Sequence, residues 1–141
     1  MSEDTHKTDE EYVSDVMARQ SIPGVLFGSA IGAVVGAMLF ATFGGMGATL
    51  VVLLLLPAAV VGFGAKFVGQ PIGWKLRLIP ATVALILHGL GSYLLFPSAI
   101  AIGLTPVSFA IAWYFSKAAM SQLEEKALWR QKHGFPTPKR S

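Results

Sequence analysis

The sequence predicts an all-α integral membrane protein in which four transmembrane helices form two hairpins, with a short amphipathic helical extension at each terminus. Its 141 residues are 53% hydrophobic and only 13% charged, whereas a soluble domain is usually about 25% charged. The charges are also segregated, because no Lys, Arg, Asp or Glu occurs in residues 21–65 or 78–116. Each uncharged stretch is long enough for two spanning helices of about 20 residues joined by a turn.

Residues 1–20 are predicted to form an acidic cytoplasmic segment. Thr8 and Glu11 have the spacing of a capping box ahead of apolar residues that share one helical face. We expect a short amphipathic helix on the membrane surface or against a partner, although a frayed polar tail fits the pattern equally well. The acidic start lacks the basic first part of a signal peptide, so the apolar helices are expected to stay in the mature protein.

Residues 21–117 are predicted to be the four-helix transmembrane domain. Its first hairpin has spans at about 22–43 and 46–65, with the glycine-rich stretch 44–47 as the outer turn. Pro57 falls in the middle of the second span and is expected to bend it, because proline lacks the N–H of one helical hydrogen bond.

Four glycines recur at every fourth position of the first span: Gly24, Gly28, Gly32 and Gly36. Residues at this spacing lie on one side of a helix, where the missing side chains form a shallow groove. Such a glycine zipper lets another helix approach closely. The partner is left open between a span of the same chain, which is slightly favoured, and the first span of another copy.

The second hairpin is predicted to have spans at about 78–96 and 98–116. It follows a basic loop, residues 66–77, in which glycine and proline residues break the helix. Trp74 in this loop suits the boundary between membrane and water.

Residues 118–141 are predicted to form a cytoplasmic amphipathic helix followed by a basic disordered tail. Since nothing breaks the helical pattern before Gly134, the fourth span is expected to continue directly into this helix. Met120, Leu123 and Ala127 are expected to line one of its faces.

The basic residues indicate the topology. All eleven Lys and Arg residues fall in 1–20, in the 66–77 loop or after residue 116, which four spans would bring to one side of the membrane. The positive-inside rule then places both termini in the cytoplasm, and a bacterial inner membrane is the expected location. The basic residues expected to face lipid headgroups are Lys66, Lys75, Arg77, Arg130 and Lys132. Alternatively, the acidic N-terminal and basic C-terminal segments pair with each other.

His88 is the ionisable residue well inside a predicted span, with Ser92 and Tyr93 nearby. Intramembrane ionisable residues suggest a proton relay or a ligand contact. The alternative, which we favour, is a neutral histidine bonded to a neighbouring helix as structural glue.

Several classes of function are disfavoured. The chain has no cysteine, which excludes disulfides and thiolate chemistry. Every Asp and Glu lies in the terminal segments, which argues against an ion-coupled transporter. No catalytic, metal-binding or cofactor-binding motif is present, and the basic residues flank apolar spans rather than forming a nucleic-acid patch.

The predicted function is that of a non-catalytic accessory, assembly or scaffold subunit in the membrane. Its expected partners are the lipid bilayer and either further copies or a larger membrane protein. The alternative is a homo-oligomeric channel or permease for a small solute, with His88 lining the path. An enzyme is the third possibility.

Overall fold

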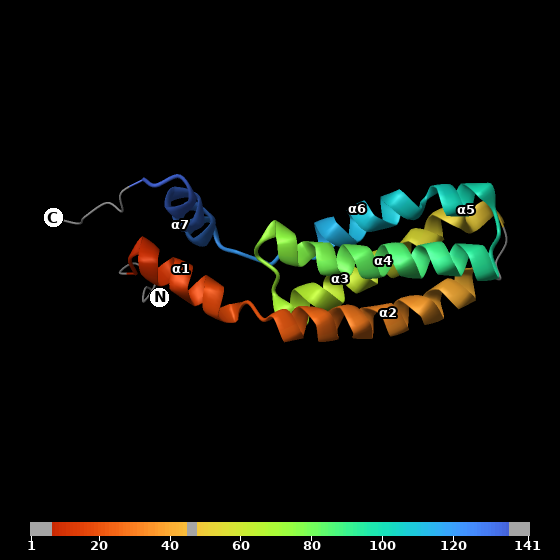
Figure 1. Cartoon of the computed structure of the whole chain (residues 1–141), viewed down its shortest axis with the longest axis horizontal. Helices are drawn as coiled ribbons and strands as arrows, with labels where there is room; N and C mark the ends of the chain where they lie inside the picture. The colour runs from red at the N-terminus through yellow and green to blue at the C-terminus, as the bar shows by residue number, and fades with distance from the viewer. Residues whose placement is uncertain (1–6, 45–47, 136–141) are drawn as a thin grey trace. The chain divides into compact units, whose positions relative to one another are not determined.

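The computed structural model describes residues 7–44 and 48–135, and every regular element within these ranges is a helix (Figure 1). The prediction of an all-helical chain is therefore confirmed for this part of the sequence. The elements are α1 (Asp9–Arg19), α2 (Ile22–Gly44), the 3₁₀-helix η2 (Ala48–Leu55), α3 (Leu56–Gly69), α4 (Trp74–Leu95), α5 (Ala99–Gly103), α6 (Thr105–Phe115) and α7 (Gln122–Lys132).

The chain divides into two compact units. Residues 21–118, here called the bundle, contain α2 to α6. Residues 1–20 and 119–141, here called the terminal unit, contain α1 and α7, which contact each other.

Three helical stretches of the described residues are long and apolar enough to cross a membrane: Ile22–Gly44, Val52–Gly69 and Trp74–Leu95. They suggest a membrane protein, as the sequence predicted. The fourth expected span is divided in the structure, because Leu104 separates the short α5 from α6.

The second span differs from the prediction. Pro57 lies in the first turn of α3, not in the middle of an α-helix, and the preceding residues form the 3₁₀-helix η2. Proline has no N–H and its ring clashes with the carbonyl four residues earlier, so it suits the start of an α-helix. The outer turn expected at 44–47 falls largely on residues 45–47, outside the described residues.

The basic loop expected at 66–77 is much shorter in the structure. α3 continues through Lys66 to Gly69, and Trp74 already begins α4. Gln70 ends α3 in the left-handed conformation, with φ of 45°. The backbone of the adjoining loop is tied to the bundle, since Ala118 donates its N–H to the Pro71 carbonyl at 3.4 Å.

Many residues buried in the bundle are small, although Phe40 and Leu54 are buried as well, and many large apolar residues are exposed. α2 packs chiefly on α3, whereas α4 packs about equally on α2 and α6. The core among these helices contains Ala58, Val61, Ala84 and Ala112. The exposed residues of α2 include Leu26, Phe27, Ile31, Val34, Val35 and Met38. This arrangement suits a bundle surrounded by lipid, where close approach of small residues drives helix packing.

Both helices of the terminal unit begin with a capping box. Thr8 and Glu11 form the predicted one at α1. Ser121 and Glu124 form another at α7, so the expected continuation of the fourth span into this helix is wrong. Of the three residues expected on one face of this helix, Met120 precedes α7, Leu123 is exposed and Ala127 is buried.

Candidate functional site

The four glycines of the first span lie where α2 meets α3. A Cβ atom on Gly24 would lie 2.7 Å from the Val68 carbonyl oxygen, and one on Gly32 would lie 2.7 Å from the Val61 Cα. Real Cβ atoms essentially never come this close to backbone. Any side chain in this row would therefore push α2 away from α3.

The pairing of α2 with α3 is antiparallel, and α3 contributes glycines of its own. Gly28 meets Gly64, where a Cβ on either residue would overlap the other's carbonyl oxygen. Gly69 lies so close to the backbone of Val25 that a Cβ would overlap it. Sequence reasoning missed Gly64 and Gly69, because it treated their stretch only as a helix end beside a basic loop.

Gly36 lies at the other end of the row. A Cβ there would lie 3.0 Å from Leu87 Cδ2 on α4 and 3.2 Å from the Pro57 carbonyl oxygen of α3. The row thus runs along α3 and ends where α2 also meets α4.

His88 of α4 is enclosed where four elements of the bundle converge. Its side chain is 2% exposed. Its Nε2 lies 2.9 Å from the Ala101 carbonyl oxygen of α5, and its Nδ1 lies 3.2 Å from the Leu54 carbonyl oxygen of η2. The ring of Phe40, from α2, meets the imidazole edge to face with centroids 5.5 Å apart.

The carbonyl groups that face His88 come from places where the regular helical hydrogen bonding is interrupted. In the 3₁₀ pattern of η2, the carbonyl of Leu54 would accept from residue 57, but Pro57 has no N–H. The Ala101 carbonyl lies just before the break between α5 and α6, and accepts the Leu104 N–H at 3.2 Å. Each ring nitrogen of His88 therefore faces a carbonyl oxygen, to which a nitrogen that carries a proton can donate.

Of the two polar residues expected near His88, one joins it in the structure. The Ser92 hydroxyl donates to the Ala101 carbonyl at 3.4 Å and is fully buried. Tyr93 does not join them, because its side chain is 71% exposed. One step along a helix turns the side chain by about 100°, which carries Tyr93 from the buried face to the outside.

Arg77 lies differently from the prediction that it faces lipid headgroups. Its side chain is 9% exposed. Its Nε and Nη2 donate to the Trp113 carbonyl at 3.0 and 2.6 Å, and its guanidinium carbon lies 3.7 Å from the centroid of the Trp113 indole. A guanidinium can stack and donate at the same time, so Arg77 ties the start of α4 to the end of α6.

The other basic residues singled out from the sequence are more accessible. Lys75 is exposed, and its Nζ lies 5.9 Å from the Trp74 ring. Lys66 is half-buried, with its Nζ 5.9 Å from the Phe63 ring. Arg130 pairs with Asp9 at 3.0 Å, whereas Lys132 is exposed.

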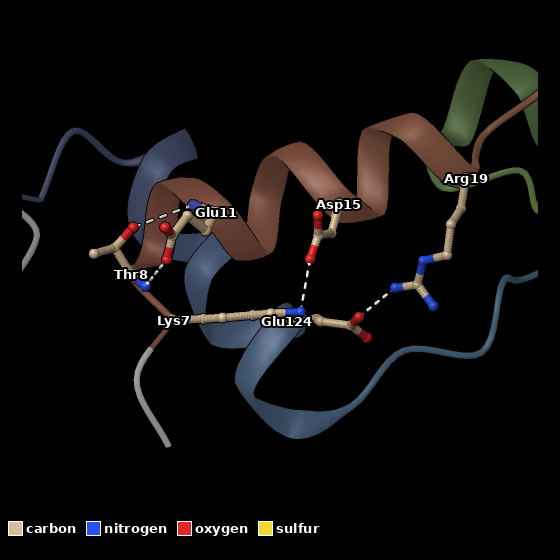
Figure 2. Close-up of polar contacts among 6 residues, drawn as sticks. All are labelled: Lys7, Thr8, Glu11, Asp15, Arg19 and Glu124. Atoms are coloured by element: carbon tan, nitrogen blue, oxygen red, sulfur yellow. Dashed lines mark hydrogen bonds and ion pairs between the residues drawn. The ribbon is translucent and has the colours of Figure 1, made fainter. Parts of the chain in front are cut away.

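Ion pairs join the two helices of the terminal unit. Arg19 of α1 pairs with Glu124 of α7 (Figure 2), and Arg130 of α7 pairs with Asp9 of α1. Lys7 pairs with Asp15 at 2.9 Å. A cleft of about 440 Å³ lies between the helices, and its lining residues include Lys7, Asp15, Arg19 and Glu124. The acidic and basic segments therefore pair, which was one of the two alternatives.

Among the described residues, no three His, Asp or Glu side chains gather as they would around a metal ion. Comparisons with protein-family models, with curated proteins and with solved structures found no match to this chain. What the chain does is therefore inferred from the bundle and the terminal unit themselves.

Proposed function

We propose that this chain is a non-catalytic accessory, assembly or scaffold subunit of a membrane. In this proposal the bundle is a four-span anchor, and the terminal unit is held on its cytoplasmic side as a surface for a partner. The observation that carries the proposal is the pairing of α1, which precedes the first span, with α7, which follows the last.

The pairing of α1 with α7 supports an even number of membrane crossings. Two helices joined by ion pairs lie on the same side of a membrane, and three crossings would separate them. The segment 99–115, made of α5, Leu104 and α6, is uncharged and 17 residues long. At 1.5 Å per residue it reaches about 25 Å, close to the roughly 30 Å hydrocarbon core. We therefore assign it as the fourth span.

The distribution of basic residues supports a cytoplasmic terminal unit. Four spans bring residues 1–20, the segment 66–77 and the C-terminal segment to one side, and these carry all eleven Lys and Arg residues. The positive-inside rule makes that side the cytoplasm. An inner membrane of bacterial type fits this arrangement.

The glycine zipper is assigned to packing within the chain. Because α3 occupies the glycine row of α2, a second copy has no access to it. The large exposed side chains of α2, such as Phe27 and Met38, are left to contact lipid or another membrane protein. This favours an anchor with an outer apolar surface over a homo-oligomer built on the zipper.

The enclosure of His88 favours a structural role over a channel. A residue that lines a path for solute must be reachable from it, and the His88 ring is surrounded by Phe40 and two backbone carbonyls. Its contacts with the Leu54 and Ala101 carbonyls instead hold η2 and α5 against α4.

Purification and reconstitution test this proposal. The full chain is extracted from its native membrane in a mild detergent, and its mass is compared with the 15.0 kDa of one copy. The proposal predicts a complex with a larger membrane protein at fixed stoichiometry, and no solute flux from the purified chain in vesicles. Solute flux from the chain alone, lost in His88→Gln without a loss of stability, would support the permease instead.

A further inference from the structure

An exposed aromatic cluster lies at the end of α7. The Trp129 ring stacks on Phe135, with centroids 5.3 Å apart and planes at 13°, and lies 4.5 Å from the His133 ring. Trp129 and Phe135 are each 54% exposed. Large aromatic side chains left this open usually mark an interaction surface or a membrane boundary.

The backbone at the end of α7 holds this cluster in place. Gly134 has a φ of 67°, the left-handed conformation that glycine adopts at helix ends. Phe135 donates its N–H to the Arg130 carbonyl at 3.1 Å, and Gly134 donates to the Gln131 carbonyl at 3.2 Å. These are the two hydrogen bonds of a Schellman motif. They turn the chain back so that Phe135 lies on Trp129.

Basic residues flank the aromatic cluster along α7, while Asp9 and Glu10 of α1 line a cleft with Phe135 on its other side. Residues 126–141 contain five Lys and Arg residues and no Asp or Glu. Lys126 and Lys132 are exposed on α7, about one turn from Trp129. Glu125 lies one turn before Trp129, so the positive charge is concentrated toward the C-terminal half of the helix. By contrast, residues 1–20 carry six acidic and two basic residues.

The connections to the bundle keep the terminal unit near the membrane. Only Gln20 and Ser21 separate α1 from α2, and three extended steps of the chain span at most about 10 Å. This limit applies to the Arg19 end of α1, whereas the aromatic cluster lies near Arg130, which pairs with Asp9 at the opposite end of that helix. The exposed aromatic and basic side chains of the cluster have the composition of a surface that lies among lipid headgroups.

We propose that the face of α7 bearing Trp129, His133 and Phe135, with Lys126 and Lys132, binds the anionic surface of the membrane that holds the bundle. The aromatic rings enter the headgroup region, and the lysines contact lipid phosphates. α1, with its opposite charge, stays away from the lipid. This inference rests on the bundle being embedded in the membrane, and it does not depend on which protein the chain assembles with.

Because the chain has no cysteine, one environment-sensitive fluorophore can report on each helix. Gln122→Cys puts the label on the same face of α7 as Trp129, and Ser14→Cys puts it on an exposed position of α1 as the matched control. The full chain is reconstituted in vesicles of phosphatidylcholine, with or without phosphatidylglycerol. Flotation of the protein with the vesicles checks separately that the bundle is inserted.

With phosphatidylglycerol present, we expect the emission from position 122 to shift to the blue and to lose its quenching by aqueous iodide, while the emission from position 14 stays unchanged. Trp129→Ser removes the shift. Lys132→Gln lowers the ratio of bound to free α7 about fivefold, the effect of one basic residue near an anionic surface. The proposal would be overturned if the emission wavelength at position 122 did not change with anionic lipid, or if it shifted equally at positions 122 and 14.

Discussion

At the scale of single residues, the packing of the bundle depends on glycines, which have no side chain. Gly28 and Gly64 bring two backbones into direct contact, and Gly32 lies against the backbone of Val61. Backbone atoms cannot move aside as the end of a flexible side chain can. A larger residue at these positions is therefore expected to destabilise the bundle. Elsewhere on α2 the same addition costs little, because side chains such as Val35 are exposed.

Gly32→Leu is therefore expected to destabilise the bundle by about 1–3 kcal/mol or more, the usual cost of overpacking a core. Val35→Leu, one turn away on the exposed face, is expected to change stability little. Thermal unfolding in detergent, followed by circular dichroism and size-exclusion chromatography, compares the two. Equal melting temperatures and equal oligomer sizes would show that the glycine row does not hold α2 to α3.

His88 is the other residue whose role follows from its surroundings. His88→Gln keeps an N–H donor for one of the two carbonyls, whereas His88→Leu leaves both without it. We expect the leucine variant to be less stable than the glutamine variant by about 1 kcal/mol, a usual value for a hydrogen bond within a membrane. The same unfolding assay measures this. Two variants of native stability that both lose function would instead indicate that His88 handles protons or a ligand.

Residue roles that depend on tertiary contacts were the least predictable from the sequence. The glycine spacing and the position of His88 within an apolar helix could be predicted directly, because both are local patterns. The burial of Arg77 could not, since it requires the Trp113 carbonyl and indole, 36 residues later in the chain. Nor could the sequence say which carbonyls would face His88.

At the scale of the elements, helix positions were easier to predict than helix ends. The first span was expected at 22–43 and is Ile22–Gly44, because its ends coincide with a change in composition. The end of the second span was predicted too early, because Lys66 was interpreted as the start of a loop. A long lysine side chain is tolerated near the end of a helix. The start of α7 was missed although Ser121 and Glu124 have capping-box spacing.

The capping box of α7 gives a prediction at this scale. Ser121→Ala removes the hydroxyl that accepts the Glu124 N–H at 3.3 Å, and such a loss costs about 1 kcal/mol of helix stability. We expect faster hydrogen exchange in the first turn of α7. Gln122→Ala, at the exposed next position, is the control and should leave the exchange unchanged or slow it. Equal exchange in both variants would mean that α7 is held only by its contacts with α1.

At the scale of the whole molecule, the two units differ in composition. The bundle has a small-residue core and an apolar outside, while the terminal unit gathers charged residues from both ends of the chain. Because α1 and α7 come from opposite ends of the chain, their contact constrains how the segment between them can cross a membrane. Two helices that contact each other cannot be separated by a membrane, so the proposed topology has an even number of crossings between them.

Cysteine accessibility in intact cells tests the four-span topology most directly. Single cysteines are placed by Ser14→Cys in α1, Ser98→Cys between α4 and α5, and Gln122→Cys in α7, and an impermeant thiol reagent is added. The account predicts labelling at position 98 and protection at positions 14 and 122 until the cells are opened. Labelling at position 122 together with 98, with position 14 protected, would show that the segment 99–115 does not cross the membrane and would contradict the four-span account.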